Sequence, residues 1–82
     1  MKVYIDHQKL KQEMEKRLLS IDEVALKSRL TRRTIEYMLN NPERRFHLSS
    51  GKKVLRILKG LRPEDIFLPE VYTKESPIKG IK

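Results

Sequence analysis

Apolar residues recur at helical spacing in four short segments of this 82-residue chain, and polar capping residues separate the segments. Residues three or four positions apart share one face of a helix, so each segment predicts a short amphipathic helix. Helices this short gain most of their stability by packing their apolar faces together. The sequence therefore predicts the all-α class, as a compact bundle of four to five short helices.

The first three helices have recognisable ends. Asp6 is the expected N-cap of a helix that reaches about Leu18. Ser20 begins a second helix, and Glu23 three positions later completes a capping box. Thr31 caps a third helix, which ends at Asn40-Asn41-Pro42 because a residue before proline avoids the α region. The expected inner faces are, in chain order, Leu10, Met14 and Leu18; Ile21, Val24, Ala25 and Ser28; and Ile35, Met38 and Leu39.

The second half continues the pattern after a predicted loop from Asn41 to about Leu48. Ser49 or Ser50 is expected to cap a fourth helix, which closes at Gly60 and Pro63. Its expected inner face is Val54, Ile57, Leu58 and Leu61. Residues 63–68 predict one short helical piece, with proline at its first position and acids in its first turn. Residues 1–5 alternate weakly and are compatible with a short strand.

We expect one domain over residues 1–68, followed by a tail over residues 69–82. The helical pattern fails after Pro69, and the tail contains Pro77, Gly80 and scattered apolar residues. The sequence predicts an extended or disordered tail, and the tail is a candidate dimer arm.

Composition excludes several classes of protein. Cysteine is absent, so a disulfide framework, a thiol nucleophile and a thiolate zinc site are excluded. No run of eighteen apolar residues predicts a membrane span, and the N-terminus lacks a secretory leader, so we expect a cytoplasmic protein without a membrane partner. His7 and His47 are forty positions apart and are expected at the surface rather than on a metal. No residues suggest catalysis, and we expect no cofactor, metal or small-molecule ligand.

The positive charge is concentrated in one region. The chain has 19 basic and 11 acidic side chains, a net charge of +8 and a pI near 10.0. Residues 27–62 hold eleven of the basic side chains, and the only acids there are Glu36 and Glu43. A regional excess of this kind favours a polyanionic partner over a generic solvated surface.

Residues 20–40 carry the most informative pattern. Two short capped helices are separated by a turn of about three residues, and Ala25 on the inner face allows the second helix to cross closely. This is the physical requirement of a helix-turn-helix unit. Its second helix would present Arg32 and Arg33 outward, and the planar fork of arginine can pair with guanine O6 and N7.

On these residues the chain resembles the Cro and phage-repressor type of helix-turn-helix domain, also called XRE-like, over about residues 6–68. The resemblance rests on Leu10, the Ser20-to-Ala25 stretch, Ser28, the run from Leu30 to Ile35, Leu61 and the Pro63-to-Phe67 ending. It implies five short helices, binding to double-stranded DNA and a homodimer on a two-fold operator.

The resemblance also implies roles for individual residues. Four positions correspond to base-contacting residues: Arg32, Arg33, Thr34 and Tyr37. Six positions correspond to, or flank, phosphate contacts: Ser20, Ile21, Asn40, Arg44, Arg45 and Lys52. For Tyr37 two roles stay open, because the ring can contact DNA or cover the helix junction.

The chain departs from the family pattern at two places. Arg29 occupies the turn position that usually holds glycine, where φ is positive. Met14 and Leu39 stand where many members pair an arginine with a glutamate, so hydrophobic packing is expected to replace an ion pair.

Two classes of function remain open. The first is a sequence-specific DNA-binding transcriptional regulator. The second is an antitoxin with a toxin partner, or a protein-interaction module that keeps the fold without acting as a transcription factor. RNA binding is a weaker third alternative, because the chain lacks the aromatic platform usual for single strands.

Overall fold

The structure is a computed structural model that describes residues 1–68, and the predicted tail at 69–82 lies outside the described residues. The described part is compact and mostly helical, as predicted, but it also contains a small sheet. The helices are α1 (His7–Lys16), α2 (Ile21–Ser28), α3 (Arg32–Asn40), α4 (Leu48–Ile57) and α5 (Pro63–Ile66). The strands are β1 (Lys2–Ile5), β2 (Arg45–His47) and β3 (Phe67–Leu68).

The sheet corrects the all-α prediction. Its strand order is β2-β1-β3, and both pairings are antiparallel, with Val3 opposite Phe46 and Tyr4 opposite Leu68. The weak alternation at residues 1–5 did indicate β1. By contrast, β2 lies in the predicted loop and β3 in the predicted helical piece. Neither short strand has a local signal, because each is held by pairing with a segment far away in the sequence.

Helix α1 begins as predicted and ends earlier than predicted. The Asp6 side chain accepts a hydrogen bond from the Lys9 backbone N–H at 3.1 Å. Leu18 lies past the end of the helix with a φ of 57° and is 87% exposed. The Leu19 N–H donates to the Met14 carbonyl at 2.8 Å, which closes the helix in the manner of a Schellman motif. Leu18 is therefore not part of the core face formed by Leu10 and Met14.

Helix α4 begins without a serine cap, so the prediction for Ser49 or Ser50 is wrong. The helix starts at Leu48, and His47 at the N-cap position makes no side-chain capping bond. The Leu48 N–H donates instead to the Met1 carbonyl at 2.9 Å. Because β2 runs directly into α4, pairing with the N-terminal strand supplies the partner that a cap would otherwise provide.

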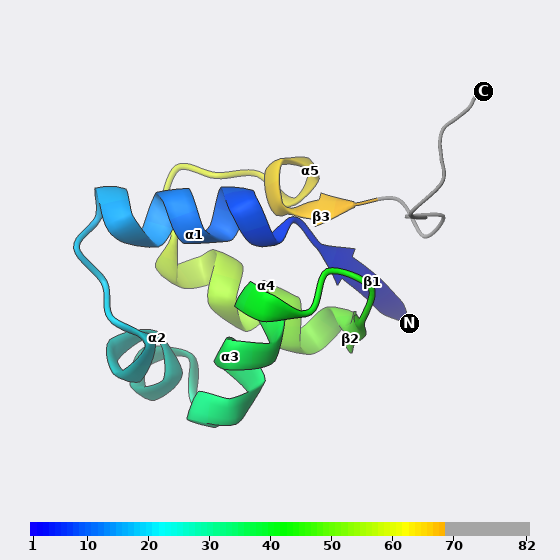
Figure 1. The fold of residues 1–82 in the computed structure, drawn as a ribbon. Helices are drawn as coiled ribbons and strands as arrows, with labels where there is room; N and C mark the ends of the chain where they lie inside the picture. Colours follow the sequence, from blue (N-terminus) through cyan, green and yellow to red (C-terminus); the bar gives the residue numbers. More distant parts are fainter. Residues whose placement is uncertain (69–82) are drawn as a thin grey trace.

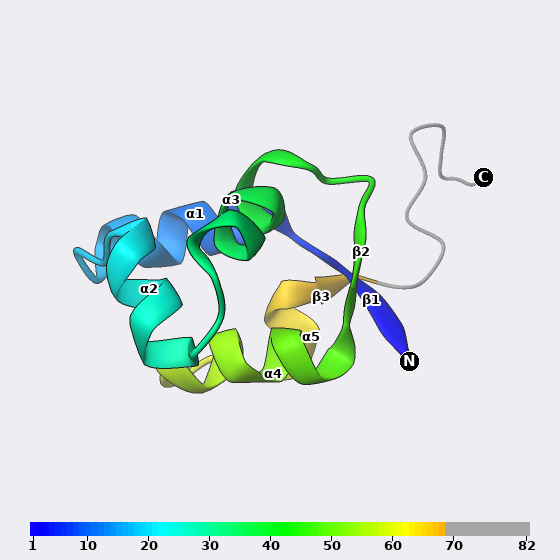
Figure 2. The ribbon, with the colours of Figure 1, turned by 90° about the horizontal axis from the view of Figure 1, so that it is seen from below.

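The core lies where α1, α3, α4 and the sheet meet. Figures 1 and 2 show α4 behind α3, with α2 at one end of the molecule and the sheet at the other. Gly51 permits the close approach of α4 to β3, because a Cβ there would lie 2.7 Å from the Phe67 ring. The largest fully buried side chains are Leu10, Val24, Ile35, Met38, Val54, Leu58 and Ile66. Of the stripe predicted on the fourth helix, Ile57 and Leu61 are only partly buried.

Candidate nucleic-acid interface

Helices α2 and α3 are both capped as the sequence predicts. The Ser20 Oγ accepts from the Glu23 N–H at 3.1 Å, and the Glu23 carboxylate accepts from the Ser20 N–H at 2.9 Å. The Thr31 Oγ1 accepts from the Thr34 N–H at 3.1 Å. These local bonds satisfy N–H groups that have no partner within the helix, and so define where each helix begins.

A left-handed residue joins the two helices. Arg29 has φ 62° and ψ 34°, which confirms the positive φ expected at this turn. The Leu30 N–H donates to the Ala25 carbonyl at 3.0 Å and reverses the chain toward α3. Arg29 is exposed, so its side chain adopts this strained backbone without being buried.

Small and apolar residues bring α2 and α3 together. Ala25 and Ser28 are buried on α2, and Ile35 and Met38 are buried on α3. The Ser28 Oγ donates to the Val24 carbonyl at 2.6 Å, so its hydroxyl is satisfied inside the core. The packing leaves the opposite face of α3 on the surface.

The two arginines that begin α3 have different environments. Arg32 forms ion pairs with Asp22 of α2 and with Glu36 of α3, the latter with 3.1 Å between Nε and Oε2. The two carboxylates, Asp22 first, raise the pKa of Arg32. Arg33 is exposed and forms no ion pair within residues 1–68. Thr34, the third predicted base contact, is half-buried, with its Oγ1 2.9 Å from that of Thr31.

Tyr37 covers the junction between α3 and the segment that follows it. The ring is half-buried against the core, and the Arg44 guanidinium carbon lies 4.3 Å from its centroid. The same carbon lies 5.9 Å from the centroid of Phe46 in β2. Of the two roles considered for Tyr37, the isolated chain shows the covering one. Arg44, a predicted phosphate contact, stacks on Tyr37.

The predicted phosphate contacts near α2 line an open hollow. Ile21 and Asn40 border a depression of about 530 Å³ together with Leu39 and Pro42. Three α1 residues that the sequence analysis did not assign complete the lining: His7, Gln8 and Lys11. Ser20 is exposed, but its backbone N–H is already donated to Glu23.

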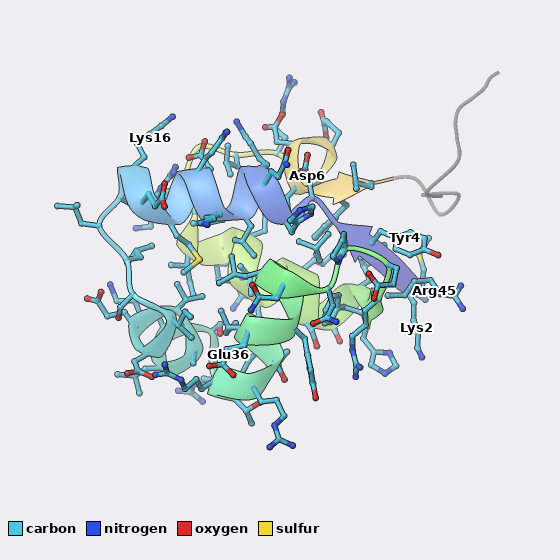
Figure 3. The ribbon with its side chains drawn as sticks, viewed as in Figure 1. Lys2, Tyr4, Asp6, Lys16, Glu36 and Arg45 are labelled. Carbon is cyan, nitrogen blue, oxygen red and sulfur yellow. The ribbon has the colours of Figure 1, made fainter. Side chains whose placement is uncertain are left out.

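The remaining predicted contacts lie elsewhere. Arg45 is exposed on β2, at the sheet end of the molecule with Lys2, while Glu36 marks α3 (Figure 3). Lys52 is exposed on α4 and borders a second hollow with Met1, His47, Leu48 and Ser49. The structure thus places Arg45 and Lys52 on two other elements, β2 and α4, apart from the α2–α3 unit.

A buried carboxylate on α1 was not anticipated. Glu13 is 3% exposed and pairs with Arg17, with Lys9 at 3.2 Å and with Lys16 at 3.5 Å. The hydrogen bond from Arg17 is the main cause that lowers the pKa of Glu13 from 4.5 to about 2. The spacing of these basic residues at i−4, i+3 and i+4 was the signal available in the sequence. Glu13 consequently offsets part of the positive charge around α1 within the molecule.

Three further expectations concern core packing at Met14 and Leu39, metal binding and membrane spans. Met14 is buried and Leu39 is packed against the same core, in line with apolar residues at both family positions. Across residues 1–68, no three His, Asp or Glu side chains are grouped to hold a metal ion. None of the helices in this part of the chain is long and apolar enough to cross a membrane.

Comparison of the chain with protein-family models, curated proteins and solved structures found no match. The resemblance to the Cro and phage-repressor family therefore rests on the sequence residues quoted above.

Proposed function

We propose that this chain is a cytoplasmic, sequence-specific transcriptional regulator of the Cro and phage-repressor type that binds double-stranded DNA as a homodimer. One observation carries the proposal. Two capped helices joined by a left-handed turn leave the outer face of α3 exposed, with Arg33 unpaired among the described residues. An α-helix fits the major groove, and an unengaged arginine at its start can donate two hydrogen bonds to guanine.

The proposed contacts divide into two kinds. Arg33, with Arg32, Thr34 and Tyr37 as further candidates, would contact base edges. Phosphates would be held by Ser20, Ile21, Asn40, Arg44, Arg45 and Lys52. Base contacts discriminate between sequences, whereas phosphate contacts position the protein on any duplex.

Substitution of one residue of each kind tests the proposal. After selection of a preferred duplex, fluorescence anisotropy compares the preferred and a scrambled sequence at several salt concentrations. Arg33→Ala should cost about 1–3 kcal/mol on the preferred duplex and much less on the scrambled one. Lys52→Ala should weaken both alike and lower the salt slope by about one.

Lys27→Ala is the matched control, because it removes one exposed charge from α2 outside both sets. It should change the ratio of affinities less than Arg33→Ala does, and the salt slope less than Lys52→Ala does. If Arg33→Ala weakened both duplexes equally, α3 would not be the helix that reads the bases.

A protein-interaction module is the second candidate, and exposed apolar side chains favour it. Leu18 and Leu26 are 87% and 80% exposed, more than is usual for leucine in a small domain. A chain with this function, such as an antitoxin, would bind duplexes without discriminating between sequences. The anisotropy experiment therefore separates the two candidates.

A further inference from the structure

Some basic side chains of the described residues are paired with acids. Lys9, Lys16 and Arg17 pair with Glu13, and Arg32 on α3 pairs with Asp22 and Glu36. By contrast, Lys52, Lys53, Arg56 and Lys59 form no ion pair with any residue of 1–68. Residues 48–62 contain no acid at all. We call these four basic residues, on α4 and just past its end, the α4 basic row.

The α4 basic row faces away from the core. Arg56 is two positions from both Val54 and Leu58, and residues two apart lie nearly opposite each other around a helix. Val54 and Leu58 are 2% and 0% exposed, whereas all four members of the row are exposed. The row therefore covers the outer surface of α4.

The outer surface of α4 is not the surface that α3 presents. Helix α2 packs against both α3 and α4. Figure 1 shows α4 behind α3, and Figure 2, seen from below, shows the two helices on different sides of the molecule. A duplex in contact with the start of α3 would leave Arg56 and Lys59 unoccupied.

The stability of helix α4 does not by itself explain why four basic residues lie on its outer surface. Like charges at i and i+4, as at Lys52 and Arg56, destabilise a helix. Basic residues favour a helix C-terminus, which accounts for Arg56 and Lys59 but not for Lys52 and Lys53 in the middle of α4. An external polyanion would compensate all four.

We infer that the part of the α4 basic row beyond Lys52, namely Lys53, Arg56 and Lys59, binds the phosphates of a second segment of duplex DNA. Lys52, at the start of the row, stays with the phosphates of the first duplex, which α3 reads. Within the helix the row extends about 6 Å, from Lys52 to Arg56, since each helical residue rises about 1.5 Å. A duplex presents about one charge per 1.7 Å of axis, so about three or four phosphate charges lie within that length. The row has no aromatic side chain, which favours a duplex over a single strand. The choice of DNA as the polyanion rests on the proposed function.

Capture of a second duplex tests the inference. The protein is bound to an immobilised preferred duplex, and retention of a fluorescent second duplex is measured at several salt concentrations. Arg56→Gln/Lys59→Gln should retain the second duplex about ten-fold less than wild type, with a salt slope lower by about two. Its affinity for the first duplex should equal that of the matched control.

The matched control is Lys2→Gln/Lys27→Gln, which removes the same charge from β1 and α2. Circular dichroism checks that both variants fold. Equal retention by both variants, or no retention by wild type, would overturn the inference. So would a selective loss of first-duplex binding in Arg56→Gln/Lys59→Gln, because the row would then belong to the duplex that α3 reads.

Two further outcomes test, in turn, the choice of DNA over RNA and the proposed function. Retention of a single-stranded RNA in place of the second duplex would overturn the inference in favour of RNA. If wild type bound the preferred and scrambled duplexes equally, the proposed function would fail. Loss of capture in Arg56→Gln/Lys59→Gln alone would still support the α4 basic row as a DNA site.

Discussion

At the scale of single residues, the adjacent Arg32 and Arg33 of α3 differ in whether an acidic side chain already pairs with them. Arg32 is held by a carboxylate on each side, and Arg33 has no such partner within residues 1–68. The ion pair between Arg32 and Asp22 also connects α3 to α2, because Asp22 belongs to the first turn of α2. To contact DNA, Arg32 would have to break its ion pairs with Asp22 and Glu36.

Asp22→Asn should therefore increase affinity for DNA and reduce discrimination. The change removes the interhelical partner of Arg32 and leaves Glu36 as its one acidic partner among residues 1–68. The net positive charge beside α3 therefore increases and attracts any duplex. We expect the scrambled duplex to gain more than the preferred one, with a salt slope higher by about one. Anisotropy on both duplexes measures this. Glu43→Gln, which removes an exposed acid without contact to Arg32, is the control. Equal effects of the two substitutions would contradict a specific role for Asp22.

Arg29→Gly should leave stability unchanged or slightly higher. Glycine relieves about 1 kcal/mol of strain at φ 62° but loses a similar amount through the entropy of the unfolded chain. Arg29→Val should be destabilising, because a β-branched residue tolerates positive φ poorly. Thermal melting compares the two variants. A large loss for Arg29→Gly would show that its side chain makes a stabilising contact.

At the scale of elements, α1 depends on charge as well as on its apolar face. Three basic side chains converge on the buried Glu13, and Arg17 also donates to the Lys59 carbonyl at 2.5 Å. Arg17 thus connects the end of α1 to the chain just after α4. This connection depends on Glu13 keeping its negative charge.

The stability of the molecule should fall in acid through Glu13. Its pKa is about 2 in the folded chain and near 4.5 when unperturbed, so the folded state favours the carboxylate. The stabilisation is complete above about pH 4.5 and is lost as pH falls toward 2. Urea unfolding between pH 2.5 and 6 should show a weaker pH dependence for Glu13→Gln than for wild type. Glu15→Gln, an exposed neighbour, should retain the dependence; equal slopes for both variants would refute the role of Glu13.

At the scale of the whole molecule, the proposed function gives each protomer only one short helix, α3, with which to read bases. One helix contacts only a few base pairs, so two-fold pairing is the usual route to specificity. We propose the segment from Pro63 to Leu68, together with the candidate dimer arm, as the surface through which the protomers pair. The segment is visible as α5 and β3, and β3 is an edge strand of the sheet.

We expect two protomers on each preferred site. Half-sites should be about 34 Å apart, and insertion of about five base pairs should abolish cooperative binding, because it rotates one half-site to the opposite side of the duplex. Sedimentation of the full chain with each duplex measures the stoichiometry. A single protomer that binds with undiminished specificity would contradict the dimer.

Local signals were sufficient for much of the fold. Asp6, Ser20 and Thr31 cap the helices that they were predicted to cap, and Arg29 adopts the predicted positive φ. These features depend on bonds between residues at most five positions apart, so a single stretch of sequence contains both partners. The same holds for the periodic faces that place Leu10, Val24, Ile35 and Val54 in the core.

Features that depend on distant partners were decided only by the tertiary structure. Strands β2 and β3 form because β1 lies between them, and α4 begins at Leu48 because Met1 supplies the acceptor. Arg32 contacts Asp22 and Tyr37 contacts Arg44, and these contacts limit how freely either residue can bind DNA. Packing brings each partner beside its residue. The sequence by itself determined the existence of the helices, the starts of α1, α2 and α3, the turn and the regional charge, since neighbours along the chain specify them. Tertiary packing decided the sheet and which charges stay unpaired, because those depend on segments that only folding brings together.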